Sequence, residues 1–188
     1  MKYETYLLQN TTELYEFIEL LRKNGVRSYL EIGCKFGGSL WRIARSLPFG
    51  SRIVAVDLPH GDTSFKETLP HLRQCLDELC KLGYDAHLII GDSTAPEIVN
   101  RVRSFSPFDA CFIDANHTAP YVRKDFANYG AMAKIVAFHD IGFRRPNGMP
   151  PGKKPIEVPA VWESIKQMHR FVEIRRDKQD NGIGVLWT

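Results

Sequence analysis

The chain contains the segment Tyr29-Leu-Glu-Ile-Gly-Cys-Lys-Phe-Gly-Gly-Ser39 and, after a helical stretch, Ile53-Val-Ala-Val-Asp57. The first segment is an apolar run that ends in a glycine-rich turn, and the second is an apolar run that ends in a carboxylate. With the helix between them they form one strand-helix-strand unit. Gly33 lets the chain turn sharply off the first strand, while Gly37 and Gly38 remove side chains where a ligand could approach the backbone.

The turn and the carboxylate together indicate a cofactor pocket. Ser39 opens the helix after the turn, and Asp57 arrives where a ribose diol could be held by two hydrogen bonds. Three residues separate Gly33 from Gly37, which is not the Gly-x-Gly-x-x-Gly spacing of dinucleotide enzymes. We therefore expect a cofactor with a ribose but no phosphate, and a nicotinamide-dependent dehydrogenase is the disfavoured alternative.

Length and composition predict one domain over residues 1–188, with 44% hydrophobic residues to build its core. The formal net charge of +3 is too small to imply a nucleic-acid partner. We expect a cytoplasmic protein, because no apolar run approaches the roughly 20 residues of a membrane span and the first residues lack a signal-peptide core. No Cys-x-x-Cys pair is present, so we expect buried, reduced thiols at Cys34, Cys75, Cys80 and Cys111.

Short β-rich runs alternate with helical runs along most of the chain, which predicts a mostly parallel, doubly wound α/β sheet with helices on both faces. The expected strands cover residues 28–33, 52–57, 86–90, 110–114 and 135–139. The expected helices cover residues 39–47, 68–82, 95–104 and 121–129, after a capped amphipathic helix within residues 1–26 that begins near Asn10-Thr11-Thr12-Glu13.

The pattern changes after His139. Residues 142–159 are rich in proline, glycine and basic residues, and we expect a loop that acts as a lid over the strand ends. A last helix over 159–169 is followed by two runs, 171–175 and 184–187, close enough in sequence to pair as an antiparallel hairpin. These two runs bring the predicted sheet to seven strands.

Polar residues follow each of the first five predicted strands, and ligands bind at the carboxyl ends of parallel strands. Each residue has an ordinary explanation, because Asp92 with Ser93 could cap a helix and His139 could be a satisfied core histidine. Together they predict a functional edge, since clustered ionisable groups need a cation, a ligand or buried partners. The residues are Glu31 and Gly33, Asp57, Gly91-Asp92-Ser93, Asp114-Ala-Asn-His117, and His139-Asp140.

These same motifs resemble those of class I S-adenosylmethionine-dependent methyltransferases. The resemblance rests on Glu31–Ser39, Val56-Asp57, Gly91-Asp92-Ser93 and Phe108–His117. The stretch Phe112–Ile141 is similar to the subgroup of cephalosporin hydroxylase-like and sugar O-methyltransferase-like proteins. The resemblance covers nearly the whole chain and implies a Rossmann-like sheet of order 3-2-1-4-5-7-6.

The resemblance also implies roles for particular residues. The turn at Gly33 would face the methionine part of S-adenosylmethionine, Asp57 would bind the ribose, and Asp92 with Ser93 would lie beside the adenine. A carboxylate at Asp92 can accept a hydrogen bond from the exocyclic amine. The expected cofactor-binding residues are Glu31, Gly33, Gly37, Gly38, Ser39, Asp57, Asp92, Ser93 and Asp114.

The metal-dependent O-methyltransferases of this fold hold a divalent ion after strands four and five, and Asp114, His139 and Asp140 fall in those places. Two carboxylates suit Mg²⁺, whereas an imidazole at His139 favours Mn²⁺, Fe²⁺ or Zn²⁺. The alternative is that His139 only forms a hydrogen bond nearby. The sequence is compatible both with a reaction that uses a metal ion and with one that does not. The reaction would transfer a methyl group from the sulfonium to an oxygen, with Asp114, His117 and His139 as the catalytic candidates.

Without a metal, His117 is the expected base, because its ordinary pKa lies near neutrality and Asp114 could hold the ring. The alternative is that His117 caps the following helix. We expect Lys124 and Asp125 on that helix to face solvent.

The expected acceptor is a hydroxyl on a small molecule or a sugar. Four bases in the 142–159 loop could recruit an acidic substrate or simply be solvated. A non-catalytic cofactor-binding or scaffold protein of the same fold is the main alternative, and a homo-oligomer is left open.

Overall fold

The computed structural model describes residues 7–59, 68–142, 155–175 and 181–188. Its strands form one seven-stranded sheet in the order β3-β2-β1-β4-β5-β7-β6, as predicted. The five parallel strands are β1 (Ser28–Ile32), β2 (Arg52–Asp57), β3 (Asp85–Ile90), β4 (Phe108–Ile113) and β5 (Ala133–His139). The hairpin of β6 (Arg170–Ile174) and β7 (Ile183–Trp187) is antiparallel, and β7 pairs with β5.

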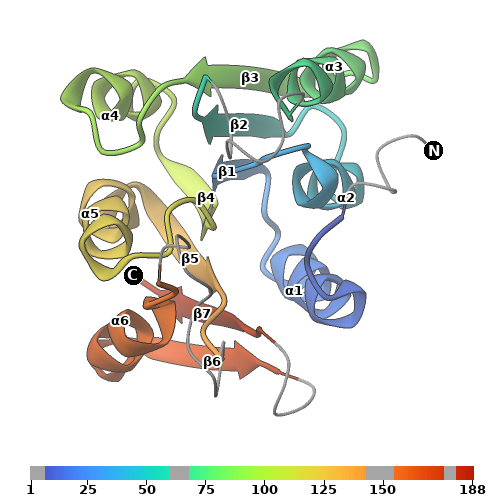
Figure 1. The fold of residues 1–188 in the computed structure, drawn as a ribbon. Coiled ribbons are helices and arrows are strands. Elements are labelled where there is room, and N and C mark those ends of the chain that lie inside the picture. Colours follow the sequence, from blue (N-terminus) through green and yellow to red (C-terminus); the bar gives the residue numbers. More distant parts are fainter. Residues whose placement is uncertain (1–6, 60–67, 143–154, 176–180) are drawn as a thin grey trace.

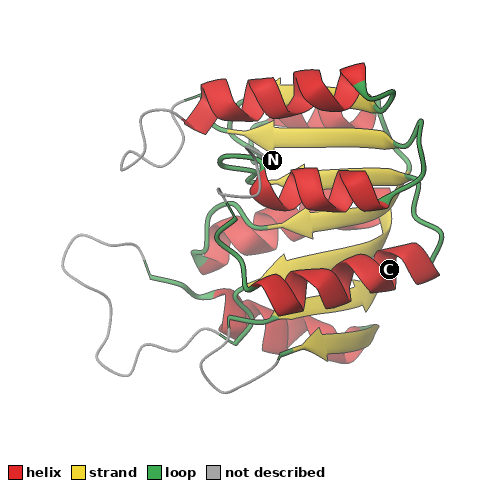
Figure 2. Ribbon diagram, turned by 90° about the vertical axis from the view of Figure 1, so that its right-hand side faces the viewer, coloured by secondary structure: helices red, strands yellow, loops and turns green. Residues whose placement is uncertain are grey.

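Helices cover both faces of the sheet (Figures 1 and 2). One face carries α1 (Thr11–Lys23), α2 (Gly38–Ser46) and α3 (Thr68–Lys81), and the other carries α4 (Pro96–Arg103), α5 (Ala119–Tyr129) and α6 (Val158–Ile165). Each face has its own apolar cluster, centred on Phe17 and Leu40 on the first and on Phe138 and Trp162 on the second. The central strands β1, β2, β4 and β5 are mainly buried, which is why they read as continuous apolar runs.

Local signals explain the helix boundaries. The Asn10 side chain accepts hydrogen bonds from the backbone N–H groups of Thr12 and Glu13, at 2.9 and 3.3 Å, and so caps α1. The last helix is shorter than predicted: α6 ends at Ile165 and a 3₁₀ turn covers Lys166–Met168. Cys34, Cys75 and Cys111 are buried as expected, but the prediction was wrong for Cys80, whose thiol is exposed.

The basic residues of the predicted 142–159 lid lie outside the described residues. In the described part of the chain, no helix combines the length and apolarity that crossing a membrane requires.

Candidate functional site

The loop between β1 and α2 lies directly against the loop that follows β4. Gly33 has a φ of +86°, and a Cβ at this position would stand 2.5 Å from the backbone of Asp114 and of Ala115. Only glycine allows both this conformation and this close approach. Gly33 therefore brings the predicted cofactor turn and the predicted catalytic loop together.

The Asp57 carboxylate organises the same turn. Its Oδ2 accepts hydrogen bonds from the backbone N–H groups of Cys34 and Lys35 at 2.9 and 2.6 Å, and its Oδ1 accepts one from Leu58 at 2.7 Å. Burial raises the pKa of Asp57, and these backbone donors oppose that rise. Asp57 thus holds the glycine-rich loop in place at the end of β2.

Gly37 does not clear space for a ligand in the way the sequence suggested. Its φ is +82°, and a Cβ there would meet the Cys75 side chain of α3 at 3.0 Å. The side-chain position of Gly37 therefore faces α3, and its role is to let α2 and α3 pack closely. Gly38 begins α2 and is buried.

Glu31 and Ser39 lie beneath the turn and bond to each other. The Ser39 hydroxyl donates to Glu31 Oε1 at 2.7 Å, and the Tyr29 hydroxyl donates to Oε2 at 2.6 Å. Glu31 is completely buried, and this burial raises its pKa to about 8. Both side chains support the loop from inside the protein rather than from its surface.

This carboxyl predicts a particular pH dependence of stability. The folded-state pKa of Glu31 lies above its ordinary 4.5, so the folded protein holds this proton more tightly than the unfolded chain does. The contribution of Glu31 to the free energy of unfolding should therefore fall as the pH rises from about 4.5 to about 8. Urea unfolding across this range should show a shallower decline in Glu31→Gln than in the wild type. Parallel curves for the two proteins would contradict the assignment.

The turn after β3 places its two predicted residues differently. Asp92 is exposed, and its Oδ1 accepts hydrogen bonds from the backbone N–H and the hydroxyl of Thr94, both at 2.8 Å. Ser93 is buried and donates its hydroxyl to Asp125 Oδ1 at 2.7 Å. The prediction that Asp125 faces solvent was wrong, because its side chain is completely buried on α5. Asp125 lies three residues after buried Val122 and four before buried Tyr129, a helical spacing that could have revealed it.

Four predicted residues meet after β4 and β5. Asp114 Oδ1 lies 3.2 Å from His117 Nε2 and 3.2 Å from His139 Nδ1. Asp140 Oδ2 lies 3.6 Å from His117 Nδ1. A fifth residue completes the cluster, because the Gln9 amide donates to Asp114 Oδ2 at 2.7 Å. Nothing in the sequence indicated Gln9, which lies 105 residues before its partner.

The charges of this cluster stabilise one another. Burial alone would raise the pKa of Asp114, but the His139 and His117 imidazoles hold it well below its usual range. Burial would lower the pKa of His139, yet Asp114 raises it to about 9. Asp114 also raises the pKa of His117 against the effect of burial. Asp114 thus favours the charged forms of both imidazoles, which makes His117 less ready to accept a proton than its ordinary pKa suggested.

The donor set for a metal differs from the predicted one. Ligand atoms of Asp114, His117 and Asp140 all lie within 4.8 Å of one another, so His117 takes the place that the sequence gave to His139. His139 is bound to Asp114 through Nδ1, and its buried Nε2 has no hydrogen-bond partner. Asp140 Oδ1 is likewise buried without a hydrogen-bond partner, with His139 Nδ1 as its charged neighbour at 3.3 Å. Two carboxylates and one imidazole with an unbonded buried oxygen fit a divalent cation.

The alternative reading of His117 as a helix cap was wrong. The N-cap residue of α5 is Thr118, and its own side chain makes no capping bond. Asn116 Oδ1 accepts the backbone N–H of Thr118 at 3.0 Å, and Glu157 Oε2 accepts that of Ala119 at 2.8 Å. The His117 ring is thus left to face the carboxylates.

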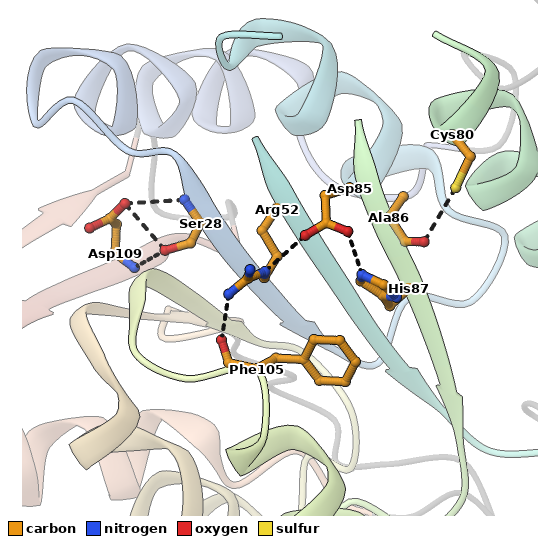
Figure 3. A network of polar contacts seen from close by, with 8 residues as sticks. All are labelled: Ser28, Arg52, Cys80, Asp85, Ala86, His87, Phe105 and Asp109. Atoms are coloured by element: carbon orange, nitrogen blue, oxygen red, sulfur yellow. Dashed lines mark hydrogen bonds and ion pairs between the residues drawn. The ribbon is translucent and has the colours of Figure 1, made fainter. Parts of the chain in front are cut away.

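A second polar network lies at the opposite, amino-terminal ends of the strands (Figure 3). The Arg52 guanidinium lies 3.0 Å from Asp85 Oδ2 and donates to the Phe105 carbonyl at 3.1 Å. The Asp109 carboxylate accepts the backbone N–H of Ser28 at 3.1 Å. These contacts join the starts of neighbouring strands and take no part in the candidate site.

Solved structures share this fold. The O-methyltransferase TomG from Streptomyces achromogenes, involved in tomaymycin synthesis and solved with S-adenosylmethionine, is 17% identical, with a TM-score of 0.68 over 97% of this chain and 82% of its own. An O-methyltransferase from Bacillus cereus in complex with S-adenosylhomocysteine (SAH) is 18% identical, with a TM-score of 0.66 over 95% and 82%. The SAH-bound methyltransferase PaMTH1 from Podospora anserina is 18% identical, with a TM-score of 0.63 over 99% and 84%. At these identities the likeness establishes the fold.

The family comes from the sequence itself. The comparison with curated proteins found no match. Residues 30–141, however, match a family described as a methyltransferase domain. These residues run from β1 to the end of β5 and include both the glycine-rich loop and the Asp114 cluster. They make up more than half of the chain, and the protein therefore belongs to this methyltransferase-domain family.

Proposed function

We propose that this protein transfers the methyl group of S-adenosylmethionine to a hydroxyl oxygen of a small molecule or a sugar. The observation that carries the proposal is the contact between two loops at Gly33, which joins the turn held by Asp57 to the loop that carries Asp114 and its imidazole partner His117. Structural neighbours crystallised with S-adenosylmethionine or SAH support the choice of cofactor, and several of them are described as O-methyltransferases.

The cofactor would lie along the carboxyl ends of β1, β2 and β3. A carboxylate has about four lone-pair positions, and Asp57 uses three of them for backbone donors, so it retains room for one ribose hydroxyl. The exposed Asp92 would accept a hydrogen bond from the adenine amine. The loop at Gly33 would face the methionine part, next to Asp114.

The acceptor would lie over Asp114, His117 and Asp140. A divalent cation such as Mg²⁺ or Mn²⁺ held by these three residues would lower the pKa of the acceptor hydroxyl and orient it. Asp114 orients both imidazoles through Oδ1, and His139 holds that carboxylate from the buried side. With such an ion bound, His117 would serve as one of its ligands; without an ion, His117 would be the group that takes the acceptor's proton.

Calorimetric titration with SAH tests the cofactor. We expect micromolar binding by the wild type and a loss of at least about tenfold in Asp57→Ala, because one charged hydrogen bond to the ribose and the anchor of the loop are both removed. The matched control is Asp77→Ala, which removes an exposed carboxylate from α3 and should leave the affinity unchanged.

The outcomes separate the candidate functions. No binding of SAH by the folded wild type would contradict the proposal. SAH binding without methyl transfer to any member of a panel of phenols, catechols and sugars would favour the non-catalytic alternative. Repeating the titration after EDTA, and then with Mn²⁺, tests whether the acidic cluster holds a metal.

A further inference from the structure

We propose that Asp125 is a positioning residue for adenine recognition, acting through Ser93 on the turn that carries Asp92. This inference rests on the proposed function, because it assigns the adenine of S-adenosylmethionine to that turn. The residue belongs to α5, the helix that comes after the Asp114–His117 loop. No sequence motif connects this helix with the cofactor.

The turn after β3 is attached to α5 at two points. Asp125 Oδ1 accepts the Ser93 hydroxyl at 2.7 Å, and the Tyr129 hydroxyl donates to the Ser93 carbonyl at 2.5 Å. All three residues are buried. At the start of the turn, the backbone N–H of Gly91 donates to the Asp57 carbonyl at 2.9 Å. Residues of α5 therefore hold both the side chain and the backbone of Ser93.

This attachment leaves Asp92 exposed and oriented. Its Oδ1 is engaged by the backbone N–H and the hydroxyl of Thr94, which closes the turn. Among the described residues, none bonds to its second oxygen, Oδ2. An exposed carboxylate with one fixed and one available oxygen suits a planar ligand edge that carries an amine, such as adenine. Asp92 keeps this orientation only while the next residue, Ser93, is held.

The burial of Asp125 is unfavourable for stability alone. Its Oδ2 is buried without a hydrogen-bond partner, and desolvation raises its pKa to about 6. An apolar side chain would continue the buried stripe formed by Val122 and Tyr129 without that desolvation. Unlike an apolar side chain, Asp125 fixes the orientation of the Ser93 hydroxyl.

The position of α5 also connects the two halves of the site. His117, which faces Asp114 and Asp140, lies two residues before the start of this helix, and Asp125 lies within it. One rigid element therefore contacts the adenine turn and follows the loop at the methyl acceptor. Through α5, the turn proposed to bind the adenine and the loop proposed to bind the methyl acceptor would keep a fixed position relative to each other.

The experiment compares two ligands that differ at the adenine amine. SAH carries the amine, whereas S-inosylhomocysteine carries a carbonyl at the same position. We expect the wild type to prefer SAH by about tenfold or more, the usual effect of one hydrogen bond to a charged group. In Asp125→Leu and in Ser93→Ala this preference should fall to about twofold or less, through weaker binding of SAH.

Matched variants separate positioning from general destabilisation. Asp125→Asn retains the acceptor oxygen for Ser93 and should restore the preference. Lys124→Ala changes the exposed neighbour on α5 and should leave the preference unchanged. In an Asp92→Ala background, Asp125→Leu should have no further effect on the preference, because its action passes through Asp92.

The results have distinct meanings. If Asp125→Leu is folded and discriminates the two ligands like the wild type, the inference is wrong. If Asp125→Leu does not fold, Ser93→Ala decides in the same way, since it removes only one hydroxyl. A folded wild type that fails to bind SAH contradicts the proposed function and this inference with it. A wild type that binds SAH without preferring it contradicts the inference and the role given to Asp92, but not the proposed methyl transfer.

Discussion

Replacing Asp114 by Asn is expected to lower methyl transfer by at least about 100-fold, the usual scale for loss of acid-base organisation at a reacting group. Asp114 Oδ1 is the atom shared by His117 and His139, and Oδ2 accepts the Gln9 amide. An amide at this position keeps the shape but removes the negative charge that orients and charges both imidazoles. The rate should be measured as SAH release with a hydroxyl acceptor identified in the screen.

Binding measurements separate this effect from loss of the cofactor. Asp114→Asn should keep its SAH affinity within about tenfold of the wild type, because only a part of the predicted cofactor contacts involves this residue. Titration of the same variant with Mn²⁺ should show weaker binding than the wild type if the cluster of Asp114, His117 and Asp140 holds a cation. A variant that transfers methyl groups at the wild-type rate would exclude Asp114 from the chemistry.

Replacing Gly33 by Ala is expected to lower the free energy of unfolding by about 2–5 kcal/mol. A φ of +86° is unfavourable for alanine by about 1–2 kcal/mol. The new Cβ would also stand 2.5 Å from the backbone of Asp114 and of Ala115, and overpacking of this kind costs about 1–3 kcal/mol more. The neighbouring atoms belong to the main chain, so no side-chain rotation relieves the clash. Urea unfolding monitored by tryptophan fluorescence measures the loss.

Gly50→Ala is the matched control. Gly50 has a similar φ of +77°, but a Cβ there would meet no atom within 4 Å. It should therefore show only the conformational effect of about 1–2 kcal/mol. Equal losses for the two variants would mean that the loops at Gly33 can separate at little cost, and that their contact does not hold the two halves of the site together.

The fold could be predicted almost entirely from local pattern and resemblance. The strands β1, β2 and β4 are mainly buried, so each appears in the sequence as an apolar run. Asn10 caps α1 through hydrogen bonds that span at most three residues. Residues at the carboxyl ends of parallel strands share one edge by geometry, which is why Asp57, Asp114 and Asp140 could be collected before the structure was known.

Only the tertiary structure showed which of the residues at that edge form hydrogen bonds and ion pairs with one another. The sequence indicated neither the bond of Asp125 to Ser93 nor that of Gln9 to Asp114, because hydrogen bonds across 32 and 105 residues leave no periodic signal. It offered His139 as a metal ligand, whereas the ligand atoms that converge belong to Asp114, His117 and Asp140. His139 Nδ1 pairs with both carboxylates, at 3.2 and 3.3 Å. Sequence pattern by itself therefore determined the parallel strands, the edge at which their carboxyl ends meet and the residue types gathered there, since these follow from hydrophobic periodicity and chain direction. The strand order came from the resemblance to class I methyltransferases. Which oxygen meets which imidazole was decided only by folding, because that depends on side-chain directions and packing between elements distant in the chain.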